Sequence, residues 1–125
     1  QTQTPMRDAV ALLAEKRIGA LPVMDGGNVA GIFSERDVIY CMAAQGPSCL
    51  ERPVGEVMTS PAITVTRDQK IDQALALMTK RRIRHLPVVE DDSLLGFVSI
   101  GDLVKSRFDE VEREAEDLRS YIQTA

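Results

Sequence analysis

The sequence is poor in aromatic residues and in metal-binding side chains. It has no tryptophan, two tyrosines and three phenylalanines. Its only histidine is His85, and its two cysteines, Cys41 and Cys49, form no Cys-x-x-Cys pair. A structural zinc site takes about four such ligands, so we predict no metal site. We expect both cysteines to be reduced thiols, with a disulfide between them as the alternative.

Long apolar runs and an excess of positive charge are also absent. No stretch approaches the roughly 18 apolar residues that a membrane-spanning helix needs, and no signal-peptide pattern opens the chain. We therefore expect a cytoplasmic protein without a membrane partner. The formal net charge is −4, which makes a general nucleic-acid binder unlikely on charge alone. The 125 residues are enough for one domain with its own apolar core.

An internal repeat is the strongest feature of the sequence. Leu21-Pro22-Val23 recurs as Leu86-Pro87-Val88, an offset of 86 − 21 = 65 residues. Without any gap, the same offset relates further pairs, polar as well as apolar, which include Ala9 and Ala74, Leu12 and Leu77, Ile18 and Ile83, Gly31 and Gly96, Ser34 and Ser99, and Asp37 and Asp102. The chain is therefore two copies of one structural unit.

Each copy predicts the order helix, strand, strand, helix. In the first copy, Met6, Ala9, Val10 and Leu13 have helical spacing, and Thr4 is the expected helix cap. Strands are expected at 21–24 and 29–33, joined by a turn at 25–28. A second helix then starts at Ser34. One copy of about 50 residues buries little apolar surface, so we expect the two copies to pack face to face with pseudo-twofold symmetry.

The ends of the repeats define the domain organisation. Residues 61–66 predict an additional strand before the second copy, and the first copy lacks its counterpart because 65 − 65 = 0. We divide the chain into a first repeat at 1–45, a connection at 46–61, a second repeat at 62–107 and an amphipathic helix at 108–125. Within the connection, Val54, Val57 and Met58 favour a short helical turn. The fold class is α+β.

The repeated motif resembles a known family. Ile-x-x-Leu-Pro-Val, a turn and then Gly-apolar-apolar-Ser-x-x-Asp is similar to the CBS (cystathionine β-synthase) repeat, and it covers residues 18–37 and 83–102. Val57-Met58-Thr59 also resembles the connection between repeats in that family. The resemblance implies a module whose clefts bind AMP, ADP, ATP, NAD-type or S-adenosyl ligands and which regulates an attached or partner protein.

Ser34 and Asp37 suit a nucleoside on chemical grounds. A serine at a helix start can cap the helix, and free amide groups there favour an anion. An aspartate three residues later can accept hydrogen bonds from both hydroxyls of a ribose, and such charge-assisted bonds are strong. The alternative is that Ser-x-x-Asp is only a capping box. The two interpretations are compatible, since a capping serine can still line a cleft.

The resemblance implies that the clefts are built crosswise between the repeats. The first would contain Ser34 and Asp37 together with Ile63, Thr64, Arg84 and His85. The second would contain Ser99 and Asp102 with Gly19 and Ala20. We expect this second cleft to be the weaker one, because it lacks the additional strand of the first repeat and has small residues where the first cleft has cations.

A basic cluster at 80–85 stands out in an acidic protein. Lys80 and Arg81 are typical of a solvated helix end, where positive charge complements the helix dipole. Arg84 lies where the family often presents phosphate contacts, and the fork of arginine suits phosphate oxygens. His85 and Arg36 are further phosphate candidates. No nucleophile or oriented carboxylate can be identified beside His85 from the sequence, so we predict no catalytic residue and no enzyme activity.

The C-terminal segment has an apolar stripe on a helix. The stripe residues recur at spacings of three and four and are Phe108, Val111, Ala115, Leu118 and Ile122. We favour packing of this stripe against a second copy, which predicts a homodimer, over packing onto its own repeats. For the function, we predict a regulatory sensor of adenine nucleotides with AMP as the reference ligand and an unknown regulated protein. A ligand-free dimerisation or interaction module is the alternative.

Overall fold

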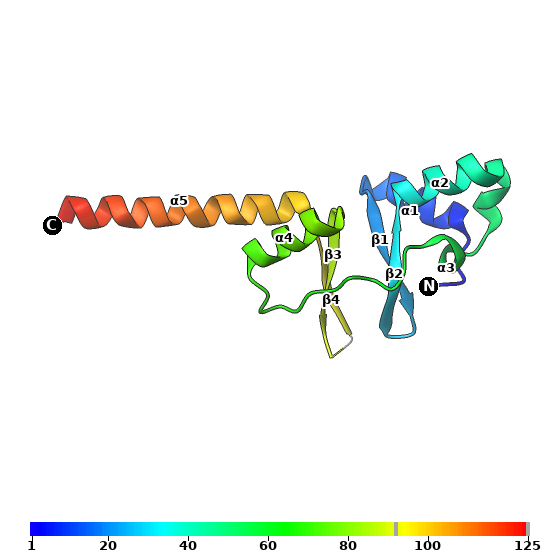
Figure 1. Ribbon diagram of the computed structural model, residues 1–125, viewed down its shortest axis with the longest axis horizontal. Coiled ribbons are helices and arrows are strands. Elements are labelled where there is room, and N and C mark those ends of the chain that lie inside the picture. Colours follow the sequence, from blue (N-terminus) through cyan, green and yellow to red (C-terminus); the bar gives the residue numbers. More distant parts are fainter. Residues whose placement is uncertain (92, 125) are drawn as a thin grey trace.

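The structure is a computed structural model that describes residues 1–91 and 93–124, with side chains up to Ile122. Figure 1 shows two small α+β units placed side by side, with one long helix leaving the second unit. The first unit contains α1 (Met6–Lys16), β1 (Ala20–Asp25), β2 (Asn28–Ser34) and α2 (Glu35–Gln45). The predicted helix-strand-strand-helix order of the first copy is confirmed.

The second unit repeats this order. It contains α4 (Ile71–Arg81), β3 (His85–Glu90), β4 (Ser93–Ser99) and α5 (Ile100–Thr124). Between the units lie a 3-10 helix, η1 (Gly46–Glu51), and the single turn α3 (Val54–Val57). The predicted helical turn in the connection is therefore confirmed.

The four strands form one antiparallel sheet in the order β1-β2-β4-β3. Within the hairpins, Ala20 lies opposite Ser34 and His85 lies opposite Ser99. The hairpins are joined where Asn28 pairs with Ser93. These two residues are equivalent in the repeat, because 93 − 28 = 65, so the pseudo-twofold axis passes through this bridge.

The backbone repeats even at its unusual positions. Arg17 and Arg82 both adopt the left-handed conformation that ends α1 and α4, with φ of 55° and 57°. The hairpin turns have positive φ at Gly26 and Asp91, 63° and 50°. Each pair is 65 residues apart. A left-handed residue lets the chain leave the helix while its N–H still bonds the last carbonyls, so the turn from helix to strand is the same in both copies.

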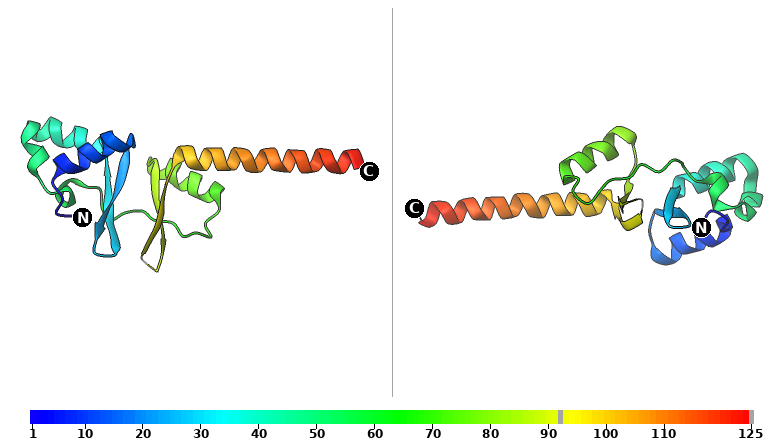
Figure 2. Two further views of the ribbon diagram at one scale, coloured as in Figure 1. Left: turned by 180° about the vertical axis from the view of Figure 1, so that it is seen from behind. Right: turned by 90° about the horizontal axis from the view of Figure 1, so that it is seen from below.

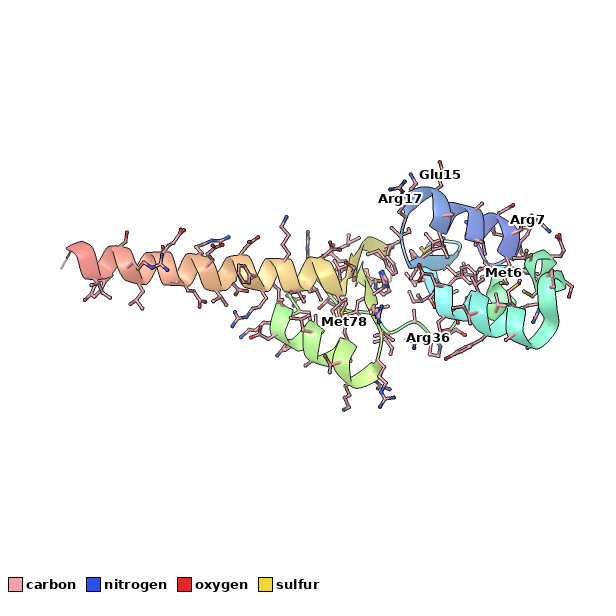
Figure 3. All side chains as sticks on the ribbon, turned by 90° about the horizontal axis from the view of Figure 1, so that it is seen from above. Met6, Arg7, Glu15, Arg17, Arg36 and Met78 are labelled. Atoms are coloured by element: carbon pink, nitrogen blue, oxygen red, sulfur yellow. The ribbon has the colours of Figure 1, made fainter. Side chains whose placement is uncertain are left out.

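Each unit has its own apolar core. Met6, Leu13 and Phe33 belong to the first cluster, whereas Met78 and Leu86 belong to the second. Figure 3 shows Met6 and Met78 well apart, one in each unit. The helices lie on the outer sides of the two hairpins, and the hairpins face each other between them (Figure 1), in agreement with the predicted packing of the two copies. The helices of each unit cover only one face of their own hairpin, so the other face is left to pack against the second repeat, and β2 and β4 touch through the single bridge of Asn28 and Ser93.

Three expectations need correction. Residues 61–66 form no complete strand; only Val65 pairs, in parallel, with Val88. Pro5 rather than Thr4 occupies the cap position of α1, and no side-chain capping bond is present there. The C-terminal helix is not a separate element, because α5 runs without a break for 25 residues from Ile100. None of the described helices combines the length and the apolar character needed to cross a bilayer.

Gly31 and Gly96 are equivalent in the repeat but differ in their surroundings, which generates a prediction. A Cβ atom at Gly31 would lie 2.6 Å from the carbonyl oxygen of Thr59 and 2.7 Å from the sulfur of Met58, whereas a Cβ at Gly96 meets nothing within 4 Å. We expect Gly31→Ala to lower the free energy of unfolding by about 1–3 kcal/mol, the usual cost of overpacking. The matched variant Gly96→Ala should be nearly neutral. Urea unfolding of both variants tests this, and equal effects would contradict it.

Candidate functional site

Ser34 and Asp37 meet at the junction of β2 and α2. The backbone N–H of Ser34 donates to Oδ2 of Asp37 at 2.8 Å, and the Ser34 hydroxyl donates to the same oxygen at 3.2 Å. The other carboxylate oxygen, Oδ1, accepts a hydrogen bond from the Thr59 hydroxyl at 3.1 Å. Both oxygens of Asp37 are therefore engaged within the chain.

Ser99 and Asp102 repeat this junction between β4 and α5. The Ser99 N–H donates to Oδ2 of Asp102 at 2.9 Å, and the Asp102 N–H donates to the Ser99 hydroxyl at 3.1 Å. This is a reciprocal capping box. Hydrogen bonds from Ser99 hold the pKa of the Asp102 carboxyl below its ordinary value. Within the described chain no hydrogen bond reaches the Oδ1 atom of Asp102, so that oxygen stays open.

The segments that precede β1 and β3 approach each other between the two junctions. A Cβ atom at Gly19 would lie 3.5 Å from Cε1 of His85 and 3.6 Å from a carboxylate oxygen of Glu35. The carbonyl of Gly19 accepts the N–H of Glu35, as the carbonyl of Arg84 accepts the N–H of Ile100. Small residues on one side thus leave room for an imidazole from the other repeat.

The remaining predicted residues lie around these junctions. Ala20 is buried opposite Ser34 in the first hairpin. Arg36 and Arg84 are exposed, and Figure 3 places Arg36 on the side of the first unit that faces the second. Ile63 packs against the second core, and Thr64 is exposed beside it. The structure brings Gly19 and His85 together; for Ile63 and Thr64 it shows no hydrogen bond to Asp37.

Two cavities extend beyond the predicted clefts. One of about 270 Å³ shares Asp37 with the first predicted cleft and is otherwise lined by residues of α2 and the connection, among them Tyr40, Arg52 and Glu56. The other, of about 400 Å³, is a groove between α1 and β1. This groove corresponds in the second repeat to the position where Val65 pairs beside β3.

Sequence reasoning missed two residues of this site. Thr59 comes from the connection and reaches Asp37 because its backbone pairs with Ile32 on the side of β2 away from β1, with N···O distances of 2.9 and 2.8 Å. Glu35 opens α2 and points its carboxylate toward Gly19 and His85. The Val57-Met58-Thr59 motif indicated that this segment matters. The contact between Thr59 and Asp37 could be found only in the folded structure. An acidic residue after the helix cap was the available signal for Glu35.

His85 is half-buried and stacks on Phe97, with ring centroids 5.4 Å apart and planes 10° from parallel. Burial lowers the pKa of His85 below its ordinary value of 6.5. The carboxylates of Asp102 and Glu35 raise this pKa, and the charge of Arg84 lowers it. Desolvation is the largest of these effects, so the folded protein favours the neutral imidazole.

This depressed pKa predicts a pH dependence of stability. Between the pKa of folded His85 and its ordinary value of 6.5, the unfolded chain binds more protons, so the free energy of unfolding rises with pH. The stabilisation is fully present above pH 6.5 and is lost as the pH falls through this window. Urea unfolding at about pH 7.5 and about pH 5.5 should show a smaller loss for His85→Gln than for the wild type. An identical loss in both proteins would contradict this origin.

Comparison with known proteins relates this architecture to a family. The model of the CBS domain matches residues 1–44 and 54–109. The CBS domain-containing protein CBSX3, mitochondrial, of Arabidopsis thaliana is 40% identical over 127 residues, which cover 98% of this chain and 62% of that protein. The two repeats and α5 account for the described residues, which form a CBS pair without a catalytic domain.

Solved structures agree with this relationship. A protein with CBS domains from Burkholderia ambifaria is 46% identical, with a TM-score of 0.78 over 84% of this chain and 77% of that chain. CBSX2 in complex with AMP is 27% identical, with a TM-score of 0.75 over 86% and 84% of the two chains. The CBS pair of MJ0100, in complex with 5′-methylthioadenosine and S-adenosyl-L-methionine, is 26% identical, with a TM-score of 0.76 over 88% and 86%. In sequence, repeat structure and sheet order, the chain belongs to the CBS domain family.

Proposed function

We propose that this chain is a regulatory sensor that binds an adenine nucleotide in the clefts between its CBS repeats and signals to a protein partner. The observation that carries the proposal is the duplicated Ser-x-x-Asp motif. In both copies it stands where a strand ends and a helix begins, with the aspartate held in place by its own serine. Between the two copies, Gly19 and His85 bring the repeats into close approach.

The chemistry of the junction suits an adenosine moiety. A fixed carboxylate accepts hydrogen bonds from a ribose diol, and unbonded amides at a helix start favour a phosphate. CBSX2 binds AMP, and MJ0100 binds two other adenosyl compounds; both observations support this ligand class here. AMP is our reference ligand, and ADP, ATP, NAD and S-adenosylmethionine are the related candidates.

Cations near the first cleft provide phosphate contacts in this proposal. Arg84 is exposed where the second repeat approaches the first, and Arg36 lies in the first turn of α2 beside Asp37. His85 adds a polar edge to the same region. An arginine fork binds two phosphate oxygens at once, so Arg84 and Arg36 would distinguish a nucleotide from a nucleoside.

The two clefts differ in whether the Oδ1 atom of their aspartate already accepts a hydrogen bond. A ribose that binds Asp37 has to share Oδ1 with the Thr59 hydroxyl, which donates to it at 3.1 Å. A ribose that binds Asp102 finds Oδ1 without a hydrogen bond from the described chain. This difference opposes the weaker second cleft predicted from the sequence, and it makes Thr59 a competitor for one acceptor site of Asp37.

The alternative function is a ligand-free interaction module, in which both Ser-x-x-Asp motifs only cap helices. The capping geometry of Ser99 and Asp102 suits that function equally well. Nucleotide binding separates the two hypotheses. The cytoplasmic setting expected from the sequence stays a prediction, since the similar Arabidopsis protein is named as mitochondrial.

A thermal-shift panel tests the sensor function. Ligand that binds only the folded state stabilises it by about 2.7 kcal/mol at 100 times Kd. We expect AMP to raise Tm at millimolar concentration, and the panel compares it with ADP, ATP, NAD and S-adenosylmethionine. Inosine monophosphate and ribose 5-phosphate serve as controls for the base. No stabilisation by any adenosyl compound would favour the interaction module.

Asp37→Ala and Thr59→Val should change AMP affinity in opposite directions. Removing the carboxylate costs about 1–3 kcal/mol of binding, the scale of a lost charged hydrogen-bond partner. Removing the Thr59 hydroxyl frees one acceptor site on Oδ1 of Asp37, so affinity should rise a few-fold. Calorimetry with AMP and with 2′,3′-dideoxyadenosine monophosphate measures both. If the dideoxy analogue loses as much affinity in Asp37→Ala as in the wild type, Asp37 does not hold the ribose.

We further propose that the functional particle is a homodimer to which α5 contributes. Beyond its contacts with α4 and β4, the helix extends away from both repeats (Figures 1 and 2). Its apolar stripe is exposed, with Phe108 at 68% and Leu118 at 61%. Burying a large apolar side chain is worth about 1.5–3 kcal/mol, and a second copy supplies the same stripe.

Light scattering on the full chain tests the dimer. We expect a particle mass of twice 13.8 kDa for the wild type. Leu118→Lys should shift the equilibrium toward the monomer, since it places two charges in the interface. Ser106→Lys adds the same charge on the opposite face of α5 and should leave the mass unchanged. A wild-type mass near 13.8 kDa would refute the dimer.

A further inference from the structure

The exposed stripe on α5 has the spacing of a coiled-coil seam. Starting at Val104, the apolar positions alternate at spacings of four and three residues and are Val104, Phe108, Val111, Ala115, Leu118 and Ile122. This places two apolar residues in each heptad on one line. All five of the large side chains in the stripe are exposed. The pattern therefore continues over about two and a half heptads of a helix that exists in the structure.

The protein's own repeats do not cover this seam. α4 packs against a different face of α5, where Leu103 joins the second core and Arg107 forms an ion pair with Asp72 at 3.2 Å. Further along, α5 projects past α4 and away from both units in every view (Figures 1 and 2). Among the described residues no other element covers the seam, and the dimer proposed above brings a second copy to it.

The charges beside the seam favour one arrangement of a second copy. Arg107 and Glu114 flank the stripe on one side, and Glu112 and Arg119 flank it on the other. In a parallel, in-register pair of helices, each residue of the first flank faces the residue five positions later on the partner. Glu114 then faces Arg119 of the second copy. Arg107 faces Glu112, but its guanidinium already pairs with Asp72 and Glu110 of its own chain at 3.2 and 3.5 Å. The Glu114–Arg119 contacts therefore decide the orientation. All four contacts across the twofold axis join opposite charges.

Antiparallel arrangements are less favourable. The alignment that overlaps the whole stripe places Glu112 against Glu112 and Glu114 against Glu114 of the second copy, and like charges in contact are destabilising. Moving the helices by one heptad toward the repeats restores opposite charges. In this shifted alignment, Leu118 lies opposite Gly101, and Ile122 lies beyond the start of the facing helix. Part of the apolar seam therefore stays exposed.

We infer that α5 forms a parallel, in-register coiled coil with α5 of a second copy, in which the Glu114–Arg119 pairs select the orientation. The inference rests on the dimer proposed above and specifies its geometry. In such a pair, both CBS modules lie at the same end of the coil, with their twofold axis along α5. Each copy contributes one half of every apolar layer.

Charge exchange on the full chain tests this orientation. Glu114→Arg and Arg119→Glu each turn two attractive contacts into repulsive ones, and each should raise the dimer Kd about tenfold, the summed effect of a few surface ion pairs. The double variant Glu114→Arg/Arg119→Glu recreates both pairs in the parallel coil and should return Kd to within about twofold of the wild type. Glu116→Arg, on the outer face, is the matched control and should change little.

The shifted antiparallel coil gives a different pattern. In that coil, Arg119→Glu is neutral and the double variant stays as weak as Glu114→Arg. Sedimentation equilibrium measures all four Kd values, and circular dichroism confirms equal helix content. A double variant that is not restored overturns the parallel coil but leaves the dimer. A wild-type chain that is monomeric at every concentration removes the dimer itself, so the two failures are distinguishable.

Cross-linking provides an independent readout. Position 118 meets its own counterpart only in the parallel, in-register coil, so Leu118→Cys should form an intermolecular disulfide rapidly under mild oxidation. Arg113→Cys, on the outer face, should cross-link at least tenfold more slowly. The native Cys41 and Cys49 are buried and give the background in the unmodified chain. Equal rates for the two variants would overturn the in-register pairing.

Discussion

The relative placement of the two repeats depends on one short strap of backbone. Thr59 exchanges two hydrogen bonds with Ile32 of β2, and Val65 bonds Pro87 and Val89 of β3 at 3.0 and 2.9 Å. Only five residues separate these two attachments. Each repeat has its own apolar core, and the two clusters share no buried residue. The strap and the Asn28–Ser93 bridge join the two repeats through backbone hydrogen bonds.

Much of the fold could be predicted from the sequence because the repeat doubles each local signal. The helix spacing at Met6 and Ala9 reappears at Ile71 and Ala74, and the Leu-Pro-Val strands reappear with the same turn. What could not be predicted is which residues join the two copies. The bridge between Asn28 and Ser93 and the pairing of Thr59 with Ile32 depend on the path of the chain in space, and neither the periodicity nor the offset of 65 residues records that path.

In the candidate site, too, the sequence predicts the hydrogen bonds between neighbouring residues but not those between residues far apart in the chain. The bonds of Ser34 to Asp37 and of Ser99 to Asp102 span three residues, so the motif alone predicts them. The Thr59–Asp37 bond spans 22 residues and depends on the path of the strap. Sequence made the two copies look alike except for the cations of the first cleft. The structure adds a second difference, because both oxygens of Asp37 accept hydrogen bonds within the chain, whereas Oδ1 of Asp102 accepts none from the described residues.

The continuity of α5 has a mechanical consequence. Its first turn contains Asp102 and is capped by Ser99, while its last described turns lie far from the repeats. With a rise of about 1.5 Å per residue, the 25 residues form a rod about 37 Å long. An unbroken rod works as a lever, so a tilt of about 10° at its base moves its tip by about 6 Å. A rearrangement of one hydrogen-bonded junction is thereby magnified into a displacement larger than the junction itself.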